Sequence, residues 1–165
     1  MKRSISIITT ERLFLRQIDE TDADSIVMMR SEKDVYQYFL NPVKLTIEDH
    51  KKWFRDCYSK NDERMDWIAV NDLDGSLVGV YGAKKSSDDE IELSYLTNRQ
   101  MRGKGYASEA VNAVIKWCGD NWKNTVFSVS VHKDNAASLL FAKSMGFFEE
   151  SSEGDFIILK MIREK

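Results

Sequence analysis

Between residues 90 and 122 the hydrophobic pattern of the chain changes its period from two residues to about 3.6. Residues 90–97 alternate like a strand with one buried face, and a loop containing Gly103 and Gly105 follows. After the loop, apolar residues recur on one helical face: Ala107, Ala110, Val111, Val114, Ile115, Cys118 and Trp122. A strand that leads through a glycine loop into a long amphipathic helix predicts a sheet and a helix packed together.

The patterns on either side of this segment predict further strands and helices. Before it, we expect strands at 5–16, 66–71 and 76–84, a helix capped by Thr21 or Asp22, and a second helix that begins near Thr46. The second helix is expected to bury four side chains, those of Ile47, Phe54, Cys57 and Tyr58. After it, we expect a strand at 127–132, a helix at 135–144 that ends at Gly146, and a strand at 156–162. This order predicts a mixed α/β fold in a single domain, residues 1–165.

Composition excludes several classes of protein. The chain has 24 basic and 27 acidic residues, so it lacks the basic excess of a nucleic-acid-binding protein. It contains no long apolar segment and no signal-peptide pattern, which predicts a cytoplasmic protein without a membrane partner. Two cysteines and two histidines stand far apart in the sequence, so we expect no metal site and free thiols in the core.

The glycine loop predicts an anion site. Glycines allow a tight turn whose N–H groups approach a ligand, and the start of a helix adds unpaired N–H groups and a positive dipole end. Arg102 and Lys104 place positive charge beside the loop, which suits a pyrophosphate. The pattern is neither a P-loop nor a dinucleotide fingerprint, and by itself it is also compatible with a simple turn.

Three segments in register resemble the GNAT superfamily of acetyltransferases. Residues 102–107, Arg-Gly-Lys-Gly-Tyr-Ala, resemble its Arg/Gln-x-x-Gly-x-Gly/Ala motif. Residues 10–16, Thr-Glu-Arg-Leu-Phe-Leu-Arg, resemble the first strand of the branch that includes ribosomal-protein N-terminal and aminosugar acetyltransferases. Residues 135–138, Asn-Ala-Ala-Ser, followed by Gly146-Phe147, resemble a later helix of the superfamily. The resemblance implies a twisted, mostly antiparallel sheet of about six or seven strands flanked by about four helices.

The same resemblance implies an acetyl-CoA site, with the cofactor in an opening of the sheet. Leu96 and Thr97 are expected to offer backbone groups to the pantetheine arm, and Asn135 and Ser138 to lie on the other side of the arm, near the thioester. The backbone amides of one continuous segment are expected to hold the pyrophosphate: Arg102, Gly103, Lys104, Gly105, Tyr106 and Ala107.

Aminolysis of a thioester needs an unprotonated amine, and an alkylamine with a pKa of about 10.4 is mostly protonated at neutral pH. Glu92 is the predicted base, because it precedes Tyr95 as the glutamate does in the family's Glu-x-Gly-Tyr pattern. A solvated residue or an ion-pair partner is the alternative interpretation of Glu92. Many members have a tyrosine acid seven residues after the asparagine, but here that position is Ala142. Ser138, another hydroxyl or water therefore remain as candidate acids.

The resemblance implies an acetyl-CoA-dependent N-acetyltransferase whose acceptor is a small-molecule amine or a peptide N-terminus. An aminosugar or sugar-nucleotide amine ranks beside a protein N-terminal amine, and polyamines and amino acids rank below them. A non-catalytic acyl-CoA-binding regulatory domain is the alternative, and a generic nucleotide-binding protein is a weaker one. The sequence leaves a homodimer open.

Overall fold

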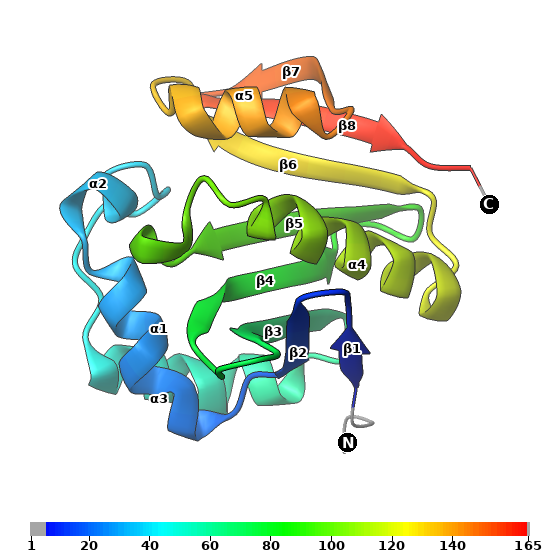
Figure 1. The fold of residues 1–165 in the computed structure, drawn as a ribbon. Coiled ribbons are helices and arrows are strands. Elements are labelled where there is room, and N and C mark those ends of the chain that lie inside the picture. Colours follow the sequence, from blue (N-terminus) through cyan, green and yellow to red (C-terminus); the bar gives the residue numbers. More distant parts are fainter. Residues whose placement is uncertain (1–5, 165) are drawn as a thin grey trace.

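In the computed structural model, which describes residues 6–164, a single eight-stranded sheet carries five α-helices (Figure 1). The strands are β1 Ile7–Thr9, β2 Leu13–Gln17, β3 Arg64–Asn71, β4 Leu77–Lys85, β5 Glu90–Thr97, β6 Val126–His132, β7 Phe148–Glu153 and β8 Phe156–Ile162. The helices are α1 Ala23–Arg30, α2 Lys33–Tyr36, α3 Ile47–Asp56, α4 Tyr106–Asn121 and α5 Ala136–Ser144. The strand order is β1-β2-β3-β4-β5-β6-β8-β7, and the mixed sheet confirms the predicted fold class.

The parallel pair β5–β6 interrupts an otherwise antiparallel sheet within residues 6–164. Its two strands are joined by α4, as the crossover between parallel strands requires. Pairing runs only from Glu90 opposite Val126 to Glu92 opposite Ser128. Beyond that point β5 continues to Thr97 and β6 to His132 without facing each other in the ladder, and the two ribbons diverge in Figure 1. The sheet is therefore open beside the second half of β5.

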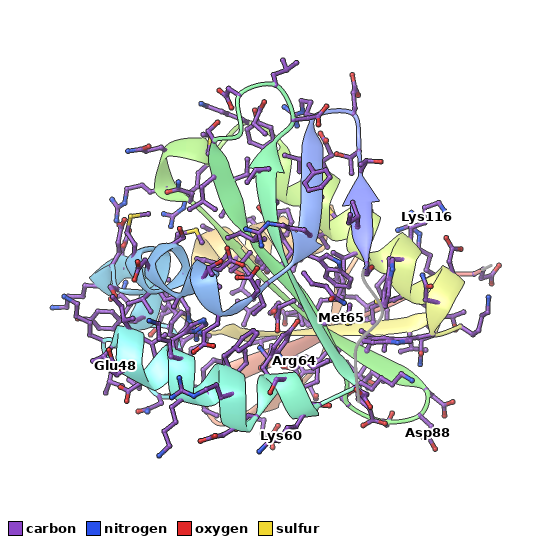
Figure 2. The ribbon with its side chains drawn as sticks, turned by 90° about the horizontal axis from the view of Figure 1, so that it is seen from below. Glu48, Lys60, Arg64, Met65, Asp88 and Lys116 are labelled. Carbon is purple, nitrogen blue, oxygen red and sulfur yellow. The ribbon has the colours of Figure 1, made fainter. Side chains whose placement is uncertain are left out.

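The two faces of the sheet are covered by different helices (Figure 2). The larger core joins Leu15, Trp67 and Leu93 of the sheet to the apolar face of α4, which includes Val114 and Cys118. Alternate strand residues point the other way, where Ile68 packs with Ile26 of α1 and with Trp53 and Phe54 of α3. Pairing of β2, β3, β4 and β5 in fixed register thus separates an α4 face from an α1–α3 face.

Two of the expected elements differ in detail. Residues 5–16 are not one strand: a turn closed by the Thr10 N–H donating to the Leu13 carbonyl at 2.9 Å divides them into the β1–β2 hairpin, and residue 5 lies outside the described residues. The helix at Thr46 is present and Thr46 accepts a hydrogen bond from the Asp49 N–H. Its expected buried face is wrong in part, because Ile47 and Cys57 are exposed whereas Tyr58 is buried.

The remaining boundaries lie close to the expected ones, with one addition. The strand β7 was not predicted, and the division of residues 5–16 into β1 and β2 adds another strand, so the sheet exceeds the expected six or seven strands. All six β7 side chains are exposed and the segment Phe-Glu-Glu-Ser-Ser-Glu is mostly polar, so it lacks the alternation that marks a half-buried strand. The short α2 also raises the number of helices. Thr21 and Asp22 lie in a 3-10 turn that precedes α1, and Asp19 caps that turn.

Candidate functional site: a cleft beside the divergent strand

A cleft of about 1380 Å³ follows the opening between β5 and β6. It is bounded by the second half of β5, the loop before α4, the start of α5 and the segment around α2. The cleft is lined by every predicted site residue except Lys104, namely Glu92, Leu96, Thr97, Arg102, Gly103, Gly105, Tyr106, Ala107, Asn135 and Ser138. Their assigned roles remain predictions.

The glycine loop turns the start of α4 toward the cleft. Gly103 and Gly105 have φ angles of +76° and +81°, a region that residues with a Cβ rarely adopt. Among residues 6–164 no side chain caps the N-terminus of α4, and Gly105, Tyr106 and Ala107 at this end of the helix line the cleft. The first N–H groups of the helix, together with the positive end of the helix dipole, fit the pyrophosphate of a CoA ester.

Arg12 fastens this loop to the β1–β2 turn. Its Nη1 donates to the Lys104 carbonyl at 2.9 Å, and its Nε donates to Glu109 Oε1 of α4 at 2.7 Å. Its guanidinium also lies 4.3 Å from the ring centroid of Tyr106. Arg12 belongs to the segment 10–16, but its positioning role was not predicted, because its partners Lys104 and Glu109 are far from it in the sequence.

The two basic residues of the loop differ in what they contact. Arg102 lines the cleft, and its Nε donates to the Thr97 carbonyl at 3.3 Å. Its Nη1 lies 3.9 Å from Asp34, which also pairs with Arg99. Lys104 is exposed and does not line the cleft. Of the two basic residues, Arg102 is therefore the one that reaches the cleft.

Glu92 lies at the last paired position before β5 and β6 diverge. Its side chain is exposed toward the cleft and forms no hydrogen bond or ion pair with other residues in the 6–164 range. The neighbouring Glu90 instead pairs with Lys160 at 2.7 Å. The geometry thus separates a structural glutamate from one whose carboxylate is available to a ligand.

A tyrosine and a serine meet across the cleft. The Tyr95 hydroxyl lies 2.6 Å from Ser138 Oγ, and the Tyr95 ring packs edge-on against Phe141 with centroids 4.8 Å apart. Burial raises the pKa of Tyr95, although the hydrogen bond to Ser138 acts in the opposite direction. Tyr95 is therefore a protonated hydroxyl at neutral pH and can donate a proton, a role that was not predicted from the sequence.

The helix α5 carries Asn135 at its start and Ala142, which occupies the position of the family's tyrosine, near its end. The Asn135 side chain accepts a hydrogen bond from the Ser138 N–H at 3.2 Å and so caps the helix. Ala142 is fully buried in the larger core and faces away from the cleft. Ala142 therefore offers no proton donor, whereas the hydroxyls of Tyr95 on β5 and Ser138 on α5 both line the cleft.

A parallel pair that opens beside a glycine loop and a helix N-terminus is the geometry of the GNAT class of acyl-CoA-dependent acyltransferases. Residues 12–148, most of the chain, match the family model described as Acetyltransferase (GNAT) domain, and the chain belongs to this family. The uncharacterized N-acetyltransferase YnaD of Bacillus subtilis (strain 168) is 27% identical over 110 residues, which cover 67% of this chain and 64% of that protein. The match thus spans slightly less than two thirds of that relative.

Solved structures share the fold at low sequence identity. RimL, a ribosomal L7/L12 alpha-N-protein acetyltransferase in complex with coenzyme A, superposes with a TM-score of 0.81 at 18% identity and covers 96% of this chain and 98% of its own. A spermidine N-acetyltransferase from Vibrio cholerae with CoA and spermine gives 0.81 at 14% identity, covering 93% and 97%. FdhC, a nucleotide-linked sugar GNAT, gives 0.80 at 18% identity, covering 95% and 90%. These neighbours establish the fold and differ in acceptor.

Two negative findings concern residues 6–164. No helix among them is long and apolar enough to cross a membrane. In the same part of the chain, His, Cys, Asp and Glu side chains form no group of three or more that could hold a metal ion.

Proposed function

We propose that this protein is an acetyl-CoA-dependent N-acetyltransferase that transfers an acetyl group to a primary amine by direct attack on the thioester. The observation that carries the proposal is the cleft at the β5–β6 divergence, which has a carboxylate without an ion-pair partner, Glu92, at its root and two hydroxyls, Tyr95 on β5 and Ser138 on α5, that meet across it. Family membership supports the cofactor, and the sheet opening is large enough for it.

Each residue has a defined task in this proposal. Glu92, directly or through water, takes a proton from the acceptor ammonium or from the amine as it attacks the carbonyl carbon. The new C–N bond forms while the C–S bond breaks, and the electron pair of that bond leaves with the thiolate. Tyr95 donates its proton to that sulfur and is reprotonated through Ser138 or solvent. The backbone of the glycine loop holds the pyrophosphate.

The acceptor class proposed here is an aminosugar or sugar-nucleotide amine, or a protein N-terminal amine. Solved neighbours of both kinds, FdhC and RimL, share the fold to a similar degree, so the fold does not choose between them. A cytoplasmic location and a homodimer are further expectations from the sequence.

An amine panel tests the proposal. Release of the CoA thiol is followed with acetyl-CoA and, in turn, an aminosugar, an amino-sugar nucleotide, short peptides and spermidine, with products identified by mass spectrometry. At least one amine should raise thiol release well above the rate of acetyl-CoA hydrolysis. Tight CoA binding without amine-dependent thiol release from any class would instead favour a non-catalytic acyl-CoA-binding domain.

A further inference from the structure

A second pocket, of about 310 Å³, adjoins the main cleft on the α3 side of the sheet. Its lining consists of Arg30, Leu45, His50, Trp53 and Arg64. Arg30, the last residue of α1, lines both spaces, so the pocket and the cleft share a wall. Figure 2 shows Arg64 beside α3, whose Trp53 ring lies 4.9 Å from the Arg64 guanidinium. None of these residues has a role in the site described above.

The two arginines leave the pocket with a positive charge. Arg64 Nε donates to the buried Asp66 carboxylate at 2.8 Å, which neutralises one of the two guanidinium groups. Arg30 stacks over Phe39 at 4.7 Å, but within residues 6–164 its guanidinium forms no hydrogen bond or ion pair. Burial, followed by the charge of Arg64, lowers the pKa of Arg30, as expected for two cations that face the same space.

The pocket also contains a buried histidine with one ring nitrogen that has no hydrogen-bond partner among residues 6–164. His50 is 2% exposed, and its Nε2 is a buried polar atom without a hydrogen bond in the described part of the chain. Burial and the nearby Arg30 lower the pKa of His50, so the imidazole is neutral at neutral pH and has one N–H to donate. A buried polar group without a partner is costly, and in the tautomer that has its proton on Nε2 an oxygen acceptor in the pocket would remove that cost.

The sheet register relates the pocket to Glu92. Asp66, Gly82 and Ser94 occupy one register row across β3, β4 and β5, and Glu92 lies in the next row. A Cβ on Gly82 would lie 2.1 Å from Asp66 Oδ1 and 2.7 Å from Ser94 Oγ, so these two side chains bend over a position that only glycine fits. Arg64 and Glu92 are both paired with Lys84 in the next row, so the pocket and Glu92 lie on the same face of the sheet.

We propose that this pocket binds an anionic group, a carboxylate or phosphate, carried by the acceptor amine. The proposal rests on the proposed function, and it names the substrate class: the amine lies in the cleft near Glu92 while the anion contacts Arg30, Arg64 and His50. Guanidinium groups bind carboxylates and phosphates through paired N–H donors, and they repel ammonium groups. Polyamines are therefore disfavoured as acceptors, although one solved neighbour is a spermidine N-acetyltransferase.

Binding tests the pocket without any turnover. Inorganic phosphate and acetate are titrated separately into the whole protein, and the ring nitrogens of His50 and the indole N–H of Trp53 are followed by NMR. Arg30→Gln should weaken binding of the preferred anion by about 10- to 100-fold, the loss expected for a hydrogen bond to a charged group. The matched control is Arg55→Gln, since Arg55 lies on α3 and pairs with the exposed Glu20. Arg64→Lys serves as the second variant because it keeps a cation beside Asp66.

Steady-state kinetics then test whether the bound anion belongs to the acceptor. The paired acceptors are 2-aminoethyl phosphate with ethanolamine, and glycine with glycinamide, so the two pairs distinguish phosphate from carboxylate. In Arg30→Gln, KM should rise by about tenfold or more for the member of the preferred pair that carries the phosphate or carboxylate and stay unchanged for the member that lacks it. Equal anion affinity in wild type and Arg30→Gln overturns the proposal, as does absence of anion binding to wild type. Anion binding that depends on Arg30, without acetylation of any amine, would contradict the proposed function alone.

Discussion

The hydroxyl of Tyr95 lies 2.6 Å from the hydroxyl of Ser138, and this contact joins the two walls of the cleft. Tyr95 extends from β5 beyond the last residue that pairs with β6, and Ser138 lies in the first turn of α5. The hydrogen bond therefore exists only because the parallel strands diverge and α5 approaches the side of β5. It places a proton donor in a cleft whose usual tyrosine position is a buried alanine.

Replacing Tyr95 by Phe should lower turnover by about 100-fold, the low end of the range for a general acid, because a thiolate is a fairly good leaving group. Ser138→Ala should lower it by about tenfold, since Ser138 acts mainly by orienting the tyrosine. Both variants keep the ring contact with Phe141. Turnover and melting temperature are measured on the same samples. Normal turnover in Tyr95→Phe with an unchanged melting temperature would leave water as the proton source.

Glu92→Gln tests the base. Turnover should fall by about 10²- to 10⁴-fold with little change in acetyl-CoA affinity, because the amide cannot accept the proton. The deficit should shrink at high pH, where a larger fraction of an amine with a pKa near about 10.4 is already deprotonated. Glu63→Gln is the control, since Glu63 is exposed and does not line the cleft. If Glu92→Gln were as active as this control at neutral pH, Glu92 would not be the base and would be a solvated surface residue.

The glycine loop can be tested against a matched turn. Gly103 and Gly75 have φ angles of +76° and +72°, and an added Cβ at either position would meet nothing within 4 Å. Substitution by Asp should therefore cost both variants a similar stability, roughly 1–2 kcal/mol. Only Gly103→Asp also places a carboxylate beside the expected pyrophosphate, so only this variant should lose CoA affinity, by about tenfold or more in calorimetry. Equal CoA affinity in the two variants would contradict the assigned pyrophosphate site.

Tyr81 is expected to make the free energy of unfolding depend on pH in the alkaline range. Burial raises the pKa of Tyr81 to about 12, while its hydrogen bond to Thr97 acts in the opposite direction. Between about pH 10 and pH 12 the tyrosine ionises in the unfolded chain but stays protonated in the folded one, so the free energy of unfolding falls as pH rises. Below pH 10 this contribution is constant.

Tyr81→Phe should make the decline with pH less steep by up to about 1.4 kcal/mol per pH unit. The measurement is the free energy of unfolding from urea titrations between pH 8 and about pH 11.5, beside wild type. The buried Cys118 thiol, whose pKa burial raises to about 12, contributes a similar decline in both proteins and so cancels in the comparison. Identical slopes would show that Tyr81 ionises in the folded protein as it does in water.

Much of the fold could be predicted from local patterns. The apolar face of α4, the cap at Thr46 and the left-handed Gly146 after α5 each depend on residues within a few turns of one another. The sequence did not predict the edge strand β7, whose residues are mostly polar. It also did not predict which apolar residues of a helix are buried, because tertiary packing decides this. In α3 the sheet covers Trp53 and Phe54 but leaves Ile47 exposed.

By itself, the sequence determined the mixed α/β class, the strand–glycine loop–helix segment and the residues proposed to line an acyl-CoA cleft, because periodicity, caps and short motifs are local properties. Only the tertiary structure decided which distant side chains meet. Strand register and the divergence of β5 from β6 bring Tyr95 to Ser138, and the β1–β2 turn brings Arg12 to the loop before α4. The packing of α1 and α3 brings Arg30, His50 and Arg64 around one pocket. Such contacts depend on how whole elements pack, and no spacing along the chain encodes them.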